Sequence, residues 1–190
     1  ITASHEKRKT LPQLVRRIAE NLNIPFTVGG GINELRDAEI LLESGADKIS
    51  VNSAAVNSPD LINKMAENFG SQFITLAIDA KYIDKAWKVF INGGRINKDK
   101  DLFQWAKEGE ERGCGEILFT SMDHDGAKEG YALEPLNELS QILNIPVIAS
   151  GGAGKMEHFS EVFTQTHVDA ALAASIFHYN EIGLQELKSY

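Results

Sequence analysis

The sequence predicts an α/β fold: a (β/α)8 TIM barrel that lacks its N-terminal strands, with about six of the eight present. Short apolar runs alternate along the chain with longer amphipathic stretches, which is typical of parallel strands joined by helices. One strand-helix-strand unit occurs twice, at residues 24–55 and 145–177. The length of 190 residues is below the roughly 250 residues usual for this fold. We therefore expect one incomplete barrel domain over residues 1–190.

Six strands are expected where the runs are β-branched and almost wholly apolar, as in strands covered on both faces. They are residues 24–28, 48–52, 74–79, 116–121, 145–150 and 170–174. Helices are expected at residues 11–21, 34–43, 59–68, 101–112, 135–143, 156–164 and 181–189. The segment 80–100 is too long for a plain loop, and its stretch AWKVFI before Asn-Gly-Gly predicts a small hairpin over one end of the barrel.

The repeat places glycines and small polar residues at matching points. Gly30 and Gly31 align with Gly151 and Gly152 after the first strand of each unit, and a serine follows the second strand in both. The strand pattern alone also fits an open doubly wound sheet. The twofold repeat favours a closed barrel built from two similar halves.

The first residues, ITAS, resemble the polar loop that leaves a strand, and no methionine precedes them. We therefore expect a fragment or a processed chain, from which two strands and one helix at the N-terminal side are missing.

Composition limits the classes of partner. The net charge of −8 argues against nucleic acid and anionic membranes, and the one dense basic cluster, at residues 5–9, is expected to be a solvated loop. A single cysteine, Cys114, excludes an internal disulfide and fits a reducing, cytoplasmic location. No apolar run reaches membrane-spanning length, and no signal peptide is recognisable. The histidines lack metal-ligand spacing, so neither a metal nor a cofactor is expected.

Glycines at the junction of a strand and a helix leave backbone N–H groups uncovered, and this geometry binds phosphate without a cationic side chain. The alternative is that the glycines only permit a tight turn. Because such a junction occurs at the same place in both halves, we expect a ligand with two phosphates, one held by each half.

Charged residues at the strand ends carry the remaining chemistry. Asp79 closes the apolar run ITLAID, where a carboxylate suits a general acid or base, although a cap or ion pair is the structural alternative. The loop SMDHDG adds Asp123 and Asp125, at least one of which is expected in an Asx-turn. Lys48 and Glu116 begin their strands and are expected to form an ion pair at the opposite, bottom end of the barrel.

Several segments together resemble one known family. They are PFTVGGGI, GADKISVNSAAV, GSQFITLAIDAK, GCGEILFTSMDHDGAKEGY, IPVIASGGAGKMEHF and DAALAASIFHY. The chain resembles, over essentially its whole length, the cyclase subunits of imidazole glycerol phosphate synthase, which are HisA/HisF-like barrels of histidine biosynthesis. That resemblance implies a heterodimer with a glutaminase subunit that supplies ammonia. It also implies a bisphosphate substrate, the phosphoribulosyl-formimino aminoimidazole carboxamide ribonucleotide. The implied products are imidazole glycerol phosphate and aminoimidazole carboxamide ribonucleotide.

The resemblance also implies roles for individual residues. Asp79 matches one of two catalytic aspartates, and the other belongs to the first strand, which is expected to be absent. One phosphate site matches Gly31 and Asn52; the other matches Asp125, Gly126, Gly152, Ala174 and Ser175. Lys48 and Glu116 match an ammonia gate, and Asp47 matches the rim that meets the glutaminase. Without its first strand, the chain is expected to have negligible cyclase activity with ammonium salts.

Three other functions stay open. The sister phosphoribosyl isomerase barrel shares the two-phosphate architecture but needs no ammonia, so the Lys48 and Glu116 pair and the LAIDAK segment favour the cyclase. A paralogue that amidates a surface sugar would share the ammonia route. A non-catalytic scaffold fragment that binds a glutaminase-like partner is the third alternative.

Overall fold

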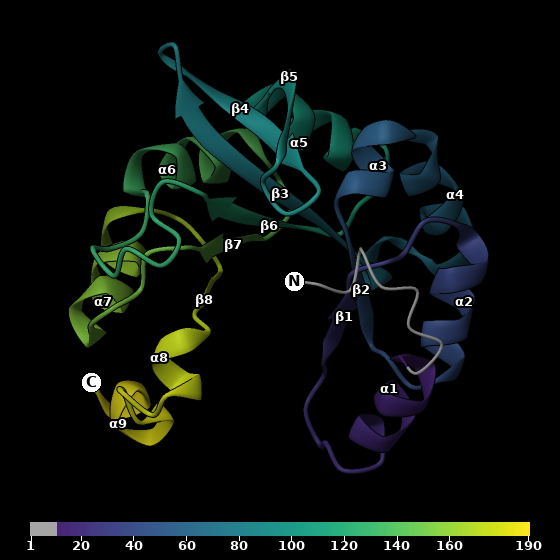
Figure 1. Cartoon of the computed structure of the whole chain (residues 1–190), viewed down its shortest axis with the longest axis horizontal. Helices are drawn as coiled ribbons and strands as arrows, with labels where there is room; N and C mark the ends of the chain where they lie inside the picture. The colour runs from purple at the N-terminus through teal and green to yellow at the C-terminus, as the bar shows by residue number, and fades with distance from the viewer. Residues whose placement is uncertain (1–10) are drawn as a thin grey trace.

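The computed structural model describes residues 11–190, in which a curled, mostly parallel sheet carries helices along its outer side (Figure 1). The parallel strands lie in chain order: β1 (Thr27–Gly29), β2 (Lys48–Val51), β3 (Ile74–Ile83), β6 (Glu116–Ser121), β7 (Val147–Ser150) and β8 (Ala170–Leu172). A doubly wound sheet would reverse its order at a switch point. The expected partial (β/α)8 barrel is confirmed. The basic cluster at residues 5–9 lies outside the described residues.

Seven expected helices are present, with ends that differ by a few residues. They are α1 (Leu11–Ala19), α2 (Leu35–Glu43), α4 (Asp60–Phe69), α5 (Leu102–Glu111), α6 (Leu133–Ile142), α7 (Met156–Gln165) and α9 (Leu184–Ser189). Three short elements were not expected: α3 (Ser53–Asn57), the 3-10 turn η1 (Ser71–Phe73) and α8 (Ser175–His178). Both α3 and α8 begin directly after a strand of the sheet, at the serine that the repeat aligned.

Two strands begin later than the sequence predicts, and for the same reason. Each expected run opened with Ile-Pro, whereas β1 begins at Thr27 and β7 at Val147. Proline has no backbone N–H to donate to the sheet, so the regular strand begins after each proline, although the carbonyl of Pro146 accepts from the N–H of Ile117 at 2.9 Å.

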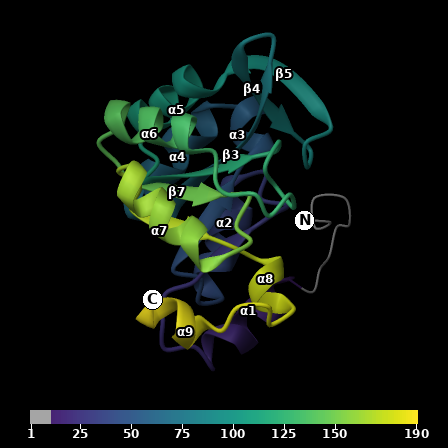
Figure 2. The same cartoon turned by 90° about the vertical axis from the view of Figure 1, so that its left-hand side faces the viewer.

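The segment after Asp79 forms more than the expected small hairpin. Strand β3 continues to Ile83 and pairs antiparallel with β4 (Ala86–Ile91), which pairs with β5 (Ile96–Asp101). The turn between β3 and β4 uses Asp84 and Lys85 at φ 50° and 63°, the positive angles that suit a two-residue hairpin turn. Figure 2 shows this antiparallel unit standing beyond one end of the parallel sheet.

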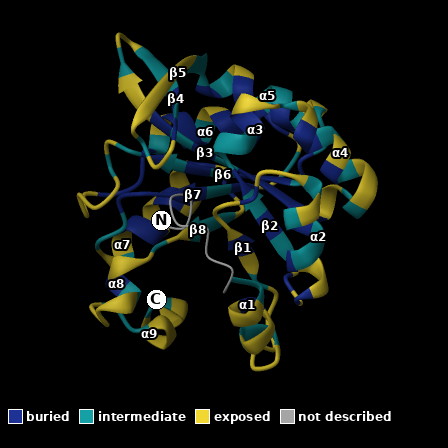
Figure 3. Ribbon diagram, turned by 45° about the vertical axis from the view of Figure 1, so that its right-hand side comes forward, coloured by how far each residue is buried: buried dark blue, intermediate teal, exposed yellow. Residues whose placement is uncertain are grey.

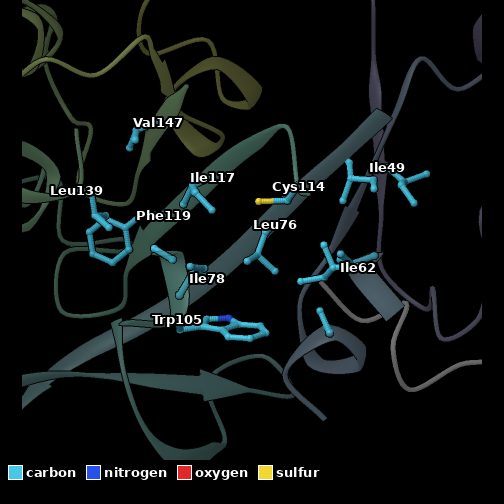
Figure 4. Packing of buried hydrophobic residues seen from close by; sticks show 14 of the residues in the cluster. Ile49, Ile62, Leu76, Ile78, Trp105, Cys114, Ile117, Phe119, Leu139 and Val147 are labelled. Atoms are coloured by element: carbon cyan, nitrogen blue, oxygen red, sulfur yellow. The ribbon is translucent and has the colours of Figure 1, made fainter. Parts of the chain in front are cut away.

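The core lies between the sheet and its outer helices. Side chains such as Ile49, Leu76 and Phe119 are fully buried on the outer face of the strands, and Trp105 of α5 is fully buried with them (Figure 4). Figure 3 shows this burial concentrated in the strands, with exposed residues along the outer helices. Cys114 belongs to this core, and burial raises the pKa of its thiol to about 12. It is therefore a packing residue, not a nucleophile.

The inner face of the strands is different, because it carries small and polar side chains. Register pairs Ser50 with Thr75, Thr75 with Glu116, and Asp79 with Thr120, so these residues point to the same side of the sheet. Strands β1 and β8 form the two edges of the sheet, and no pairing joins them among the described residues. The concave side of the curl therefore holds the groups that can do chemistry.

Gly115, just before β6, gives a test of the packing. A Cβ there would lie 2.3 Å from the backbone oxygen of Ser71, so Gly115→Ala must displace the η1 turn. We expect the free energy of unfolding to fall by about 1–3 kcal/mol, measured by urea denaturation. The matched control is Gly183→Ala, whose Cβ would meet its nearest atoms at an ordinary 3.7 Å. An equal effect of the two substitutions would contradict the packing described here.

Candidate functional site

Polar groups gather at both ends of the inner face. Lys48, Thr75 and Glu116 lie where their strands begin. Asp79 lies near the end of the part of β3 that pairs with its parallel neighbour β6, and Asn52 directly follows β2. Asp79 lies four positions beyond Thr75 along β3, which is roughly 13 Å at the rise of an extended strand. Small and apolar residues line the inner face between them, among them Ser50, Ala77 and Leu118.

At the strand starts, one carboxylate has both of its oxygens occupied. Lys48 Nζ pairs with Glu116 Oε2, and Thr75 Oγ1 donates to Glu116 Oε1 at 2.5 Å. Glu116 is only 8% exposed, and a buried carboxylate is stable only when it is paired and hydrogen-bonded. The predicted ion pair is confirmed. Thr75 was missed; its polar side chain among the apolar residues of ITLAID was a weak signal, and its partner Glu116 is known only from the register of the structure.

At the other end of the inner face, one side chain among residues 11–190 hydrogen-bonds to Asp79. Asn52 Nδ2 donates to Asp79 Oδ2 at 3.0 Å. Burial raises the pKa of Asp79 above its ordinary value, Asn52 opposes that rise, and the nearby charge of Asp125 adds to it. A carboxylate whose pKa is moved towards neutrality is suited to accept and return a proton.

The carbonyl oxygen of the Asn52 side chain, Oδ1, is buried and has no partner among the described residues. The family resemblance implies a role for Asn52 in the phosphate site of Gly31; in the structure its side-chain amide also reaches Asp79. The unpaired acceptor beside Asp79 is free for a hydroxyl or N–H group of a ligand.

The first glycine turn follows β1. Gly30 and Gly31 have φ of 94° and 75°, in the left-handed region that glycine adopts without strain. The carbonyl of Gly31 accepts from Asn33 Nδ2 at 2.8 Å. The turn leads into α2, so its free N–H groups lie beside the start of a helix.

The second glycine turn follows β7 and is packed against the loop after β6. Gly151 and Gly152 have φ of 89° and 111°. The N–H of Gly130 donates to the carbonyl of Gly152 at 2.9 Å, and a Cβ on Gly152 would lie 1.9 Å from the Gly130 oxygen. Only glycine fits at position 152, because any side chain would push the two loops apart.

The loop after β6 brings Asp125 and Gly126 beside that second turn. The N–H of Asp125 donates to the carbonyl of Ser121 at 2.9 Å, and a Cβ on Gly151 would lie 2.7 Å from the same oxygen. A Cβ on Gly126 would meet nothing within 4 Å, so this glycine borders open space. In the same loop, Asp123 Oδ2 accepts from the N–H of Tyr82 at 2.8 Å, and this hydrogen bond joins the loop to β3.

Ala174 and Ser175 form the start of α8, after β8, and β8 pairs with β7, the strand that precedes the Gly152 turn. The repeat aligns Ser175 with Ser53 of the first half, whose Oγ accepts a hydrogen bond from the N–H of Asn92 at 3.0 Å. The two serines aligned by the repeat therefore differ in their surroundings.

Asp47 lies at the opposite end of the sheet, before β2. Its Oδ2 accepts from the N–H of Phe26 at 3.0 Å, and its repeat partner Asp169 accepts from the N–H of Val147 at 2.9 Å. Both aspartates thus fix the start of the preceding strand. Asp47 also borders a hollow of about 380 Å³ with Leu22 and Ile24.

Residues 11–190 hold neither a metal-binding cluster nor a membrane-spanning helix. Residues 11–190 contain no group of three or more His, Cys, Asp or Glu side chains arranged to hold a metal ion. Within the same range no helix has the length and hydropathy needed to cross a membrane.

Comparisons with known proteins agree on one family. The model of the histidine biosynthesis protein family matches residues 1–183. The chain is 63% identical over 190 residues to imidazole glycerol phosphate synthase subunit HisF of Bacteroides fragilis (strain YCH46), and the match covers 100% of this chain and 76% of that relative. Subunits of the same name from Phocaeicola vulgatus and Elusimicrobium minutum are 62% and 61% identical, with the same coverage of both chains.

Because Asp79 is buried, replacing its carboxylate with a neutral side chain should increase the free energy of unfolding by an amount that depends on pH. A raised pKa in the folded protein means that stability is lost as pH rises from the unfolded pKa through the folded one. Asp79→Asn avoids this loss, so the variant should gain free energy of unfolding over the parent at about pH 7 but much less at about pH 4. Urea denaturation at both pH values measures the gain. Asp84→Asn, at an exposed position, should show no such difference; an equal effect of Asp79→Asn at both pH values would contradict the assignment.

Proposed function

Because the chain belongs to the histidine biosynthesis protein family, we propose that its site serves the cyclase reaction of imidazole glycerol phosphate synthase. Ammonia and the phosphoribulosyl-formimino aminoimidazole carboxamide ribonucleotide are converted into imidazole glycerol phosphate and aminoimidazole carboxamide ribonucleotide. The observation that carries this proposal is the position of Asp79, a carboxylate with a raised pKa at the strand ends of the sheet that carries both glycine turns. The reaction takes place in the cytoplasm.

The glycine turns support a substrate with a phosphate at each end. The protein has a net charge of −8, so a dianionic phosphate is better held by local N–H groups than by the overall field. Gly31 provides one site, with Asn52 at the neighbouring strand end. The other is formed by Asp125, Gly126, Gly152, Ala174 and Ser175. Asp125 is a carboxylate and cannot hold a phosphate by itself, so its part is to accept a substrate hydroxyl or to shape the loop.

The opposite end of the inner face supports entry of ammonia. Lys48 and Glu116 close this end as an ion pair, and small or apolar side chains separate them from Asp79. A route along the inner face keeps ammonia away from bulk water, where protonation would remove its nucleophilic lone pair. A glutaminase subunit docked at this end, at the rim that includes Asp47, would deliver ammonia to the gate and form a heterodimer with the chain.

The chemistry assigned to the site is proton transfer. Ammonia adds to the substrate, the imidazole ring closes, and a carbon-nitrogen bond breaks, and each step moves a proton on or off nitrogen. Asp79 acts as one of a pair of acid and base aspartates, and Asn52 orients it through the bond to Oδ2. The sister isomerase reaction needs no ammonia, so the ion pair and the lined inner face favour the cyclase over it.

The experiment that tests the function is Asp79→Asn in the complete synthase. Loss of one general acid-base group should lower kcat by roughly 100-fold or more, measured by product formation with glutamine and separately with ammonium chloride. Circular dichroism checks that the fold is kept. The matched control, Asp84→Asn, changes an exposed aspartate and should leave kcat unchanged. A kcat within about twofold of the parent in Asp79→Asn would refute the role of Asp79.

A further inference from the structure

Both glycine turns are closed by a side chain at the same position of the repeat. Alignment of Gly31 with Gly152 also aligns Asn33 with Gly154 and Asp37 with His158. Asp37 and His158 are each the third residue of the helix that follows the turn, α2 or α7. An aspartate and a histidine at this position are unlike in charge, yet each can accept a hydrogen bond.

In the first half, Asp37 accepts from the turn. Its Oδ2 receives the N–H of Asn33 at 2.8 Å and that of Glu34 at 3.2 Å. The contact also completes a capping box at the start of α2. The turn that carries Gly31 is thus held to the helix by one carboxylate oxygen.

In the second half, His158 does the same with an imidazole nitrogen. Its Nδ1 receives the N–H of Gly154 at 3.1 Å, so Nδ1 carries no proton and the neutral ring has its hydrogen on Nε2. The side chain is buried at 9% exposure. A Cβ on Gly130 would lie 3.8 Å from the ring, so the imidazole also packs against the loop that pairs with Gly152.

We propose that Asp37 and His158 are equivalent positioning residues that keep each turn in its phosphate-binding form. Each binds the N–H two residues beyond the glycine, at Asn33 or Gly154, and so fixes the direction of the N–H groups before it. Among the described residues, the N–H groups of Gly31 and Gly152 donate to no protein acceptor. They stay available to a phosphate oxygen. This inference rests on the proposed bisphosphate substrate.

The difference between the two residues follows from burial. Asp37 lies at a partly exposed position, where water solvates its charge, whereas His158 is buried between α7 and the Gly130 loop. A buried carboxylate at position 158 would cost desolvation energy and would repel the bound phosphate. A neutral imidazole keeps the acceptor without the charge.

The test compares His158→Leu with His158→Asn in the complete synthase. Leucine fills the space without an acceptor, whereas the side-chain oxygen of asparagine takes a place close to that of Nδ1. We expect His158→Leu to raise the KM for the bisphosphate and the Kd for inorganic phosphate about tenfold, the effect of one hydrogen bond, with kcat within about threefold. For His158→Asn, the KM for the bisphosphate, the Kd for inorganic phosphate and kcat should each stay within about threefold of the parent. Amide exchange at Gly154 should be faster in His158→Leu alone.

The outcomes separate the inference from the function. If the parent binds phosphate and the Leu variant binds it equally well, or if both variants lose binding alike, the positioning role is wrong and the proposed function stands. A fall in kcat with KM unchanged also refutes it. If the parent binds neither inorganic phosphate nor the bisphosphate, the proposed function itself is wrong.

Discussion

The cost of burying a carboxylate governs the inner face of the sheet, because Glu116 and Asp79 meet that cost in opposite ways. Glu116 receives a lysine on one oxygen and a threonine on the other, so its charge is compensated. Among the described residues, Asp79 receives a side-chain hydrogen bond from the Asn52 amide alone. Burial raises its pKa, and the negative charge of Asp125 nearby adds to that rise. Glu116 is thereby held in place by its two partners, whereas Asp79 is left able to exchange a proton. The assignment of gate and acid-base residue depends on this contrast.

The twofold repeat preserves hydrogen-bonding roles more closely than residue types. Asp47 and Asp169 take the same backbone partner in the two halves, and there the residue itself is repeated. At the glycine turns an aspartate in one half is matched by a histidine in the other, and only the acceptor is kept. The antiparallel unit breaks the symmetry further, since Asn92 engages Ser53 in the first half. Two similar ends that differ in detail suit a substrate whose two phosphates lie in different chemical surroundings.

Much of this architecture could be predicted from the sequence, because strand and helix patterns and the repeat are local signals. The contact between Lys48 and Glu116 could be predicted because both residues stand at the starts of their strands. Local signals failed at the Ile-Pro openings, where a missing N–H outweighs an apolar run, and at Asp84 and Lys85, which turn the chain without glycine. The contacts of Thr75, Asn52 and His158 need the register between strands or the packing of two loops, which no single segment encodes.

The central claim is that each half of the fold holds one end of a bisphosphate. A crystal structure of the synthase with an unreactive bisphosphate analogue of the substrate tests it most directly. We expect one phosphate within hydrogen-bond distance, about 3 Å, of the N–H of Gly31, the other at the N–H of Gly152, and the reacting centre beside Asp79. Both phosphates bound by one turn, or an analogue held away from Asp79, would contradict it.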